Sequence, residues 1–195
     1  AVPYLSAILA YTDLPDDYRN LMIGEIRQEQ EEYPAALEAL RVIPTNSPLY
    51  VRAQFQAANI SKDLGSTKQY REILSTLSEQ SDPFVNGEQV LYALSSSVGL
   101  DSPKAYPYLR RLWMHYPYSE QAKRIAANLT ALEKSNPSYK PTVGDWVHRA
   151  DSVMEAWQFQ QVIDELKPYV STWTTYTTDT CRVLYAYGRS HFKLN

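Results

Sequence analysis

The chain has 195 residues, of which 44% are apolar, 12% aromatic and 21% charged, a balance found in soluble globular proteins and not in disordered ones. Its net charge of −3 and the even spread of its basic residues argue against nucleic-acid binding, and the lack of an apolar run of about 18 residues argues against a membrane-spanning helix. The single cysteine, Cys181, excludes an intrachain disulfide and a metal site built from several cysteines.

Apolar residues recur at helical spacing along most of the chain, and characteristic residues mark where helices begin and end. Ser47-Pro48, Asp82-Pro83 and Ser102-Pro103 each place a capping oxygen before a proline, which suits an N-cap followed by the first helical residue. Gly65 and Gly99 stand where helices should end, because glycine adopts the left-handed conformation of that position without steric cost. The predicted helices, in chain order, span residues 4–10, 17–31, 33–43, 48–64, 67–79, 84–98, 103–115, 119–134, 145–156, 159–169 and 179–193.

The segment 169–178 is the one part of the chain that favours a β-strand, since it is rich in β-branched and aromatic residues. A single strand has no second strand to pair with, so we interpret this segment as a loop with a risk of forming an edge strand. The sequence therefore predicts an all-α fold.

The predicted helices form pairs, and the second helix of a pair carries a recurring pattern of one aromatic residue, two apolar residues and a leucine. Its copies are Tyr33-x-x-Ala36-Leu37-x-x-Leu40, Tyr70-x-x-Ile73-Leu74-x-x-Leu77, Phe159-x-x-Val162-Ile163-x-x-Leu166 and a weaker Ala105-x-x-Tyr108-Leu109-x-x-Leu112. In chain order the copies begin 37, 35 and 54 residues apart, and the last spacing is large enough to hold an extra helix, 119–134. Periods in the middle thirties are typical of helix–turn–helix repeats of the tetratricopeptide kind. The pattern predicts that Tyr33, Tyr70 and Phe159 are largely buried, and that the helix pairs stack into a superhelix.

Two short stretches resemble the tetratricopeptide consensus. Tyr116-Pro117-x-Ser119-x-x-Ala122 resembles the hinge between successive repeats, and Leu64-Gly65 resembles the turn within one repeat. Few repeats hold all the signature positions, so the chain is best described as a degenerate tetratricopeptide-like solenoid. We expect residues 1–195 to form one α-superhelical domain with a soft break near 135–144.

The C-terminal third carries a more particular order of residues. In sequence it reads Arg149-Ala150-Asp151, Met154, Phe159, Val162-Ile163, Glu165-Leu166, Thr178-Asp179, Cys181-Arg182, Tyr185, Tyr187-Gly188-Arg189 and Phe192-Lys193. This order resembles the superhelical region that precedes the catalytic domain of bacterial soluble lytic murein transglycosylases. The resemblance implies a periplasmic protein that acts on peptidoglycan, and a parent chain that begins with a secretory signal before Ala1 and continues past Asn195.

The resemblance also implies where catalysis resides. The family's catalytic domain uses a glutamate followed by serine as general acid and then base on the glycosidic bond, and no Glu-Ser dipeptide occurs in this chain. The nearest stretch begins at Glu88, which we interpret as a solvated helix residue. We therefore expect no catalytic residue, no cofactor and no metal in this chain.

Other candidates for chemistry are isolated in the sequence. None of His115, His148 and His191 has a histidine four residues away on the same helix, so we expect each on a partly exposed helix surface and none as a metal ligand. Cys181 lies in an apolar helix, where a cysteine is usually a small buried hydrophobic residue.

Arg182, Tyr185 and Arg189 form a candidate ligand groove, because their spacing places all three on one face of a predicted helix. Arginine suits an anion such as the carboxylate of a peptidoglycan stem peptide, since its planar fork bonds both oxygens. The alternative is that the arginines pair with acids of a neighbouring helix.

Two functions are consistent with these observations. The first is a non-catalytic helical platform of a periplasmic lytic transglycosylase, which positions glycan or a partner for a catalytic domain outside this chain. The second is a tetratricopeptide-like adaptor, in the periplasm or the cytoplasm, that binds a peptide or protein partner. The sequence beyond Asn195 would distinguish them.

Overall fold

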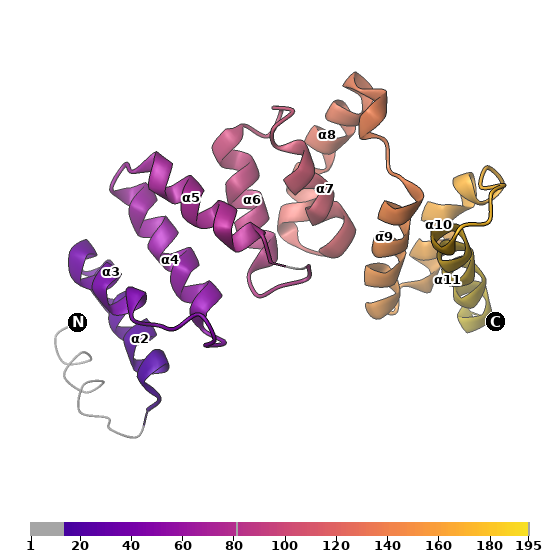
Figure 1. Ribbon diagram of the computed structural model, residues 1–195. Coiled ribbons are helices and arrows are strands. Elements are labelled where there is room, and N and C mark those ends of the chain that lie inside the picture. Colours follow the sequence, from indigo (N-terminus) through magenta and orange to yellow (C-terminus); the bar gives the residue numbers. More distant parts are fainter. Residues whose placement is uncertain (1–13, 81, 195) are drawn as a thin grey trace. The chain divides into compact units, whose positions relative to one another are not determined.

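The computed structural model describes residues 14–80 and 82–194, and all regular structure in these residues is helical. The helices, in chain order, are α2 (Asp16–Glu29), α3 (Tyr33–Arg41), α4 (Tyr50–Asp63), α5 (Thr67–Ser78), α6 (Gly87–Val98), α7 (Tyr106–His115), α8 (Glu120–Ser135), the 3-10 helix η1 (Pro137–Tyr139), α9 (Val143–Glu155), α10 (Phe159–Val170) and α11 (Thr178–Leu194). The predicted all-α fold is confirmed (Figure 1). The helix predicted at 4–10 lies outside the described residues.

Predicted and observed helices agree along the described chain, but the three proline-marked starts are wrong by a few residues. The helices begin at Tyr50, Gly87 and Tyr106, after the prolines. Ser47 Oγ accepts the Leu49 N–H at 3.1 Å, so this serine caps a turn that precedes the helix. The segment 169–178, where an edge strand was a risk, contains no strand.

The contacts of the chain divide it into two compact units, residues 1–94 and 95–195, with the boundary inside α6. Such a division is expected of a solenoid, because each repeat touches only its neighbours. It does not decide whether the chain is one domain, so the single domain with a soft break near 135–144 stays a prediction.

In the N-terminal unit two helix pairs, α2 with α3 and α4 with α5, pack against each other through α3 and α4. Gly24 allows α2 to approach α3 closely, since a Cβ atom on it would lie 2.6 Å from Leu40 Cδ2. The apolar side chains at the centre of this packing are buried; they are Leu21, Ala36, Leu40, Ile43, Ala53, Ala57 and Ile60.

In the C-terminal unit α9, α10 and α11 pack against one another, and α7 packs against both α8 and α9. The core between them is formed by Trp146, Val147, Ala150, Val153, Val162, Leu166, Val183 and Ala186. Each helix contributes residues three or four positions apart, which is the spacing that places them on one face. Stacked helix pairs in both units are the building plan of helical-repeat superhelices.

The connection between α8 and α9 is fixed to α7 by one aromatic and cationic cluster. The rings of Tyr106 and Tyr139 stack at 3.9 Å between centroids, and the Tyr106 hydroxyl donates to the Tyr139 carbonyl at 2.6 Å. The buried Arg110 donates to both of these oxygens and lies 3.4 Å from the Glu133 carboxylate. Within this unit the connecting segment is therefore held in place by ring stacking and by hydrogen bonds from α7 side chains to the Tyr139 carbonyl.

In three helix pairs the two helices are joined by a turn of the same type. Glu31, Gly65 and Trp157 follow α2, α4 and α9 respectively, and their φ angles are 60°, 71° and 59°. In each turn the N–H of this residue bonds the carbonyl three residues earlier, and the next N–H bonds the carbonyl five residues earlier. This is the Schellman motif, which satisfies the free carbonyls of a helix end. Gly65 ends its helix as predicted.

The positions of these turns align the repeats by backbone conformation alone. This alignment differs from the one predicted from the aromatic pattern and corrects it. Tyr33 and Phe159 come two residues after the residue of positive φ, whereas Tyr70 comes five residues after it. Tyr70 is buried, as predicted, but Tyr33 and Phe159 are only half-buried, because they lie in the first turn of their helices at the edge of the pair. The copy that begins at Tyr70 is therefore shifted by one helical turn.

Tyr70 leads to a prediction for alkaline pH. Burial raises the pKa of its phenol above the usual value of 10.0. The folded chain then holds this proton more tightly than the unfolded chain, so its contribution to the free energy of unfolding is lost as pH rises above about 10. In urea titrations between pH 9 and 11, Tyr70→Phe should make the fall in stability shallower than in the wild type. Equal slopes for the two proteins would contradict this prediction.

Candidate functional site

The three residues of the predicted groove lie on the exposed side of α11, but they have different surroundings. Arg182 donates to the Asp151 carboxylate of α9 at 2.9 Å, so it is engaged with an acid of a neighbouring helix. Tyr185 is 64% exposed. Arg189 lines a hollow between α9 and α11.

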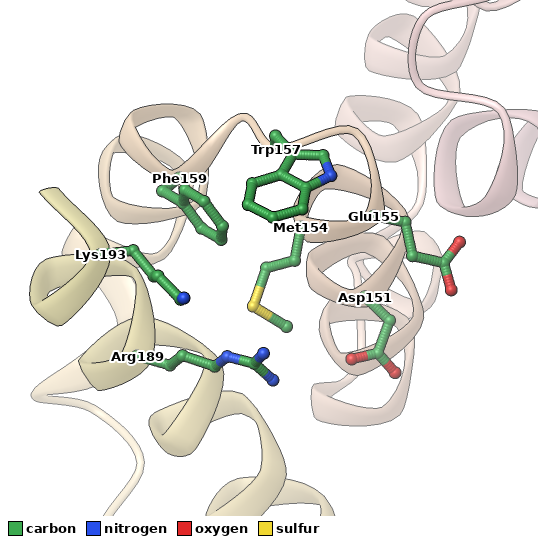
Figure 2. A pocket seen from close by; sticks show the side chains of 7 residues that line it. All are labelled: Asp151, Met154, Glu155, Trp157, Phe159, Arg189 and Lys193. Carbon is green, nitrogen blue, oxygen red and sulfur yellow. The ribbon is translucent and has the colours of Figure 1, made fainter.

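This hollow, hereafter the α9–α11 hollow, has a volume of about 340 Å³ (Figure 2). Its floor and walls come from α9, from the turn that follows it, from the start of α10 and from the last turns of α11. It is lined by Asp151, Met154, Glu155, Trp157, Phe159, Arg189 and Lys193. The hollow therefore combines charged, aromatic and thioether side chains.

Two cations of the hollow are without partners in the part of the chain that the structure describes. Arg189 and Lys193 are one helical turn apart on α11, and neither forms an ion pair or hydrogen bond with a described residue. Figure 2 shows both side chains reaching from α11 toward the centre of the hollow, while the Glu155 carboxylate is turned away from it. Because Arg182 already engages Asp151, the positive charge of Arg189 and Lys193 is available to an anion.

Trp157 stands over the other side of the hollow in an unusual backbone conformation. Its φ of 59° is rare for a bulky residue, and the equivalent turn after α4 uses Gly65 instead. The side chain is 75% exposed, and its ring meets the Phe159 ring edge to face at 5.9 Å between centroids. Because strained residues cluster at ligand sites, the strain and the exposure together make Trp157 a candidate binding residue.

The helices that carry these side chains are held together by a buried ion pair. Arg149 of α9 donates to both carboxylate oxygens of Glu165 on α10, at 3.0 and 2.7 Å, and to the Trp113 carbonyl at 2.6 Å. On α11 the buried face consists of Thr180, Val183, Ala186 and Ser190, which turns Arg189 and Lys193 outward. The ion pair thus joins α9 to α10, and α11 packs against both of these helices.

Other candidate residues do not assemble into a reactive site. Glu88 is half-exposed in the first turn of α6. The described residues hold no group of three or more His, Cys, Asp or Glu side chains arranged for a metal ion, and no described helix is long and apolar enough to cross a membrane. Cys181 is exposed near the start of α11, contrary to the expectation that it is buried.

Sequence reasoning missed two features of this unit. The rings of His115 and His148 lie 5.1 Å apart, although the residues are distant in the sequence. Trp157 and Lys193 were not recognised as site residues, yet the position of Trp157 directly after a helix, where glycine is usual, was a signal available in the sequence.

Comparison of the chain with protein-family models, with curated proteins and with solved structures finds no match.

Proposed function

We propose that the chain is a non-catalytic helical platform of a periplasmic peptidoglycan lytic transglycosylase, and that it positions peptidoglycan for a catalytic domain outside this chain. The resemblance of the C-terminal third to the superhelical region of that family supports the proposal. Stacked helix pairs are also the architecture that such a platform requires.

The observation that carries the proposal is the pair of unpartnered cations, Arg189 and Lys193, beside the exposed ring of Trp157. Peptidoglycan presents carboxylates on its peptides and apolar faces on its sugar rings. A guanidinium and an ammonium bind carboxylates, and an exposed indole packs against an apolar face. The charge and the exposed aromatic ring of the α9–α11 hollow therefore support the binding of this polymer.

The second candidate is an adaptor that binds a peptide or protein, in the periplasm or the cytoplasm. It is favoured by the aromatic side chains on the outer side of α11, where Tyr185 is 64% and Phe192 is 79% exposed. Large exposed aromatic residues of this kind are enriched at protein interfaces.

The proposal is tested by co-sedimentation of the purified chain with isolated peptidoglycan sacculi. We expect the wild-type chain to sediment with the sacculi, and the double variant Arg189→Gln with Lys193→Gln to bind at least tenfold more weakly, because the loss of even one charge-assisted bond of about 1.5 kcal/mol corresponds to about tenfold. A matched control replaces Lys104 and Arg124, two exposed cations outside the hollow, by Gln. Absence of wild-type binding would contradict the proposal.

The same material tests the absence of catalysis. Incubated with sacculi, residues 1–195 should release no anhydro-muropeptides, because the chain has no Glu-Ser motif for general acid–base cleavage. Glu88→Gln should leave sacculus binding unchanged. Products detected by liquid chromatography and mass spectrometry, and abolished by Glu88→Gln, would show that the chain has a catalytic centre.

A further inference from the structure

The side chains that line the α9–α11 hollow indicate which part of peptidoglycan it would bind. Among the described residues that line it, none carries a hydroxyl or amide side chain. Its polar side chains are instead two cations and two carboxylates, and the Asp151 carboxylate is already engaged by Arg182. The main polar feature left to a ligand is therefore the pair of cations without partners, which a carboxylate neutralises and a neutral sugar does not.

The same lining suits a carboxylate attached to a small apolar group. Arg189 and Lys193 provide N–H donors on one side, and Met154, Phe159 and Trp157 provide an apolar wall on the other (Figure 2). A volume of about 340 Å³ is that of about ten water molecules, which is room for one or two small amino-acid residues.

The balance of charge around the hollow limits the ligand further. Asp151 is paired with Arg182, which does not line the hollow, so Glu155 is the one lining acid left against Arg189 and Lys193, and one positive charge is in excess. A single carboxylate neutralises this excess, whereas a phosphate dianion would leave a negative charge near two acids. The charge therefore favours a monoanion.

We propose that the α9–α11 hollow binds the free α-carboxylate end of a peptide whose last side chain is small and apolar. The carboxylate lies between Arg189 and Lys193, and the last side chain packs on Met154 and Phe159 under the Trp157 ring. That the peptide is a peptidoglycan stem peptide rests on the proposed function. The carboxylate chemistry itself is shared with the C-terminus of any protein that ends in such a residue.

The experiment uses the ¹⁵N-labelled chain and follows the indole N–H signal of Trp157, assigned from its loss in Trp157→Phe. The probes are N-acetyl-Ala-Ala, its C-terminal amide, and N-acetylglucosamine. We expect the free acid to shift the signal with saturation, and the amide to bind at least tenfold more weakly. Arg189→Gln with Lys193→Gln should weaken binding of the acid about tenfold, and the Lys104 and Arg124 control should not. Unchanged thermal melts of the variants would show that they remain folded.

Equal shifts with the acid and the amide, no shift with the acid, or saturable binding of N-acetylglucosamine instead would each overturn the inference. Two further results separate it from the proposed function. If sacculi bind and the Arg189 and Lys193 variant binds them equally well, the inference fails and the proposed function stands. If N-acetyl-Ala-Ala binds and sacculi do not, the carboxylate site stands and its peptide belongs to a protein partner.

Discussion

Replacing Leu166 by Ala is expected to lower the free energy of unfolding by about 2–5 kcal/mol. Leu166 is 1% exposed and belongs to the core of the C-terminal unit, together with Trp146, Val153 and Val162. Truncation to Ala loses the free energy gained by burying the removed apolar atoms. It also leaves a cavity, because α9, α10 and α11 are packed against one another and cannot move closer to fill it. Urea denaturation monitored by circular dichroism at 222 nm measures the change.

The matched control for Leu166→Ala is Phe159→Ala. Phe159 belongs to the same copy of the repeat pattern, but its side chain is only half-buried at the edge of the pair. We therefore expect this larger truncation to destabilise the chain less than Leu166→Ala does. A greater loss for Phe159→Ala would show that the aromatic position, and not the leucine, anchors the helix pair.

Replacing Arg149 by Met is expected to cost about 3 kcal/mol, since removal of one partner leaves the other charge without compensation in a largely buried site. Arg149 is 7% exposed and bonds both oxygens of Glu165 as well as the Trp113 carbonyl. The Glu165 side chain retains 24% exposure, which places the expected loss at the lower end of the range for buried pairs.

A double-mutant cycle with Glu165→Met completes the measurement. The double variant should be more stable than Arg149→Met alone, because it leaves no unpaired carboxylate. Arg182→Met is the control, since the Arg182–Asp151 pair is about half-exposed and such pairs contribute less than about 1 kcal/mol. Similar losses for Arg149→Met and Arg182→Met would mean that the buried pair has no special role.

The positions of the helices could be predicted because they depend on local properties of the sequence. Ser119 caps α8 by accepting the Ala122 N–H at 3.0 Å, as its place after Tyr116-Pro117 indicates. The register of the repeats could not be predicted in the same way. A shift of three or four residues keeps an apolar stripe on the same face of a helix. The repeat pattern therefore fitted the sequence at Tyr70 as well as it fitted the other copies, although Tyr70 lies one helical turn after the equivalent position.

The candidate site was predictable only in part for a related reason. Helical spacing placed Arg189 on the correct face of α11, but it could not show that Asp151 would engage Arg182 and leave Arg189 without a partner. Pairing between residues of different helices depends on how the helices pack. The same is true of His115 and His148, whose rings meet because α7 packs against α9.

The turn shared by the three helix pairs has a consequence for how the chain can acquire new recognition. Its two closing hydrogen bonds join backbone atoms only, so the residue of positive φ contributes nothing to them with its side chain. This position holds an acid at Glu31, no side chain at Gly65 and an indole at Trp157. Side chains other than proline and the β-branched residues can therefore be displayed there, at a conformational cost of about 1–2 kcal/mol, without loss of the hydrogen bonds that close the turn. In evolution and in protein engineering alike, the residue at this position can therefore be exchanged to change what the surface recognises, while the helix pair is kept.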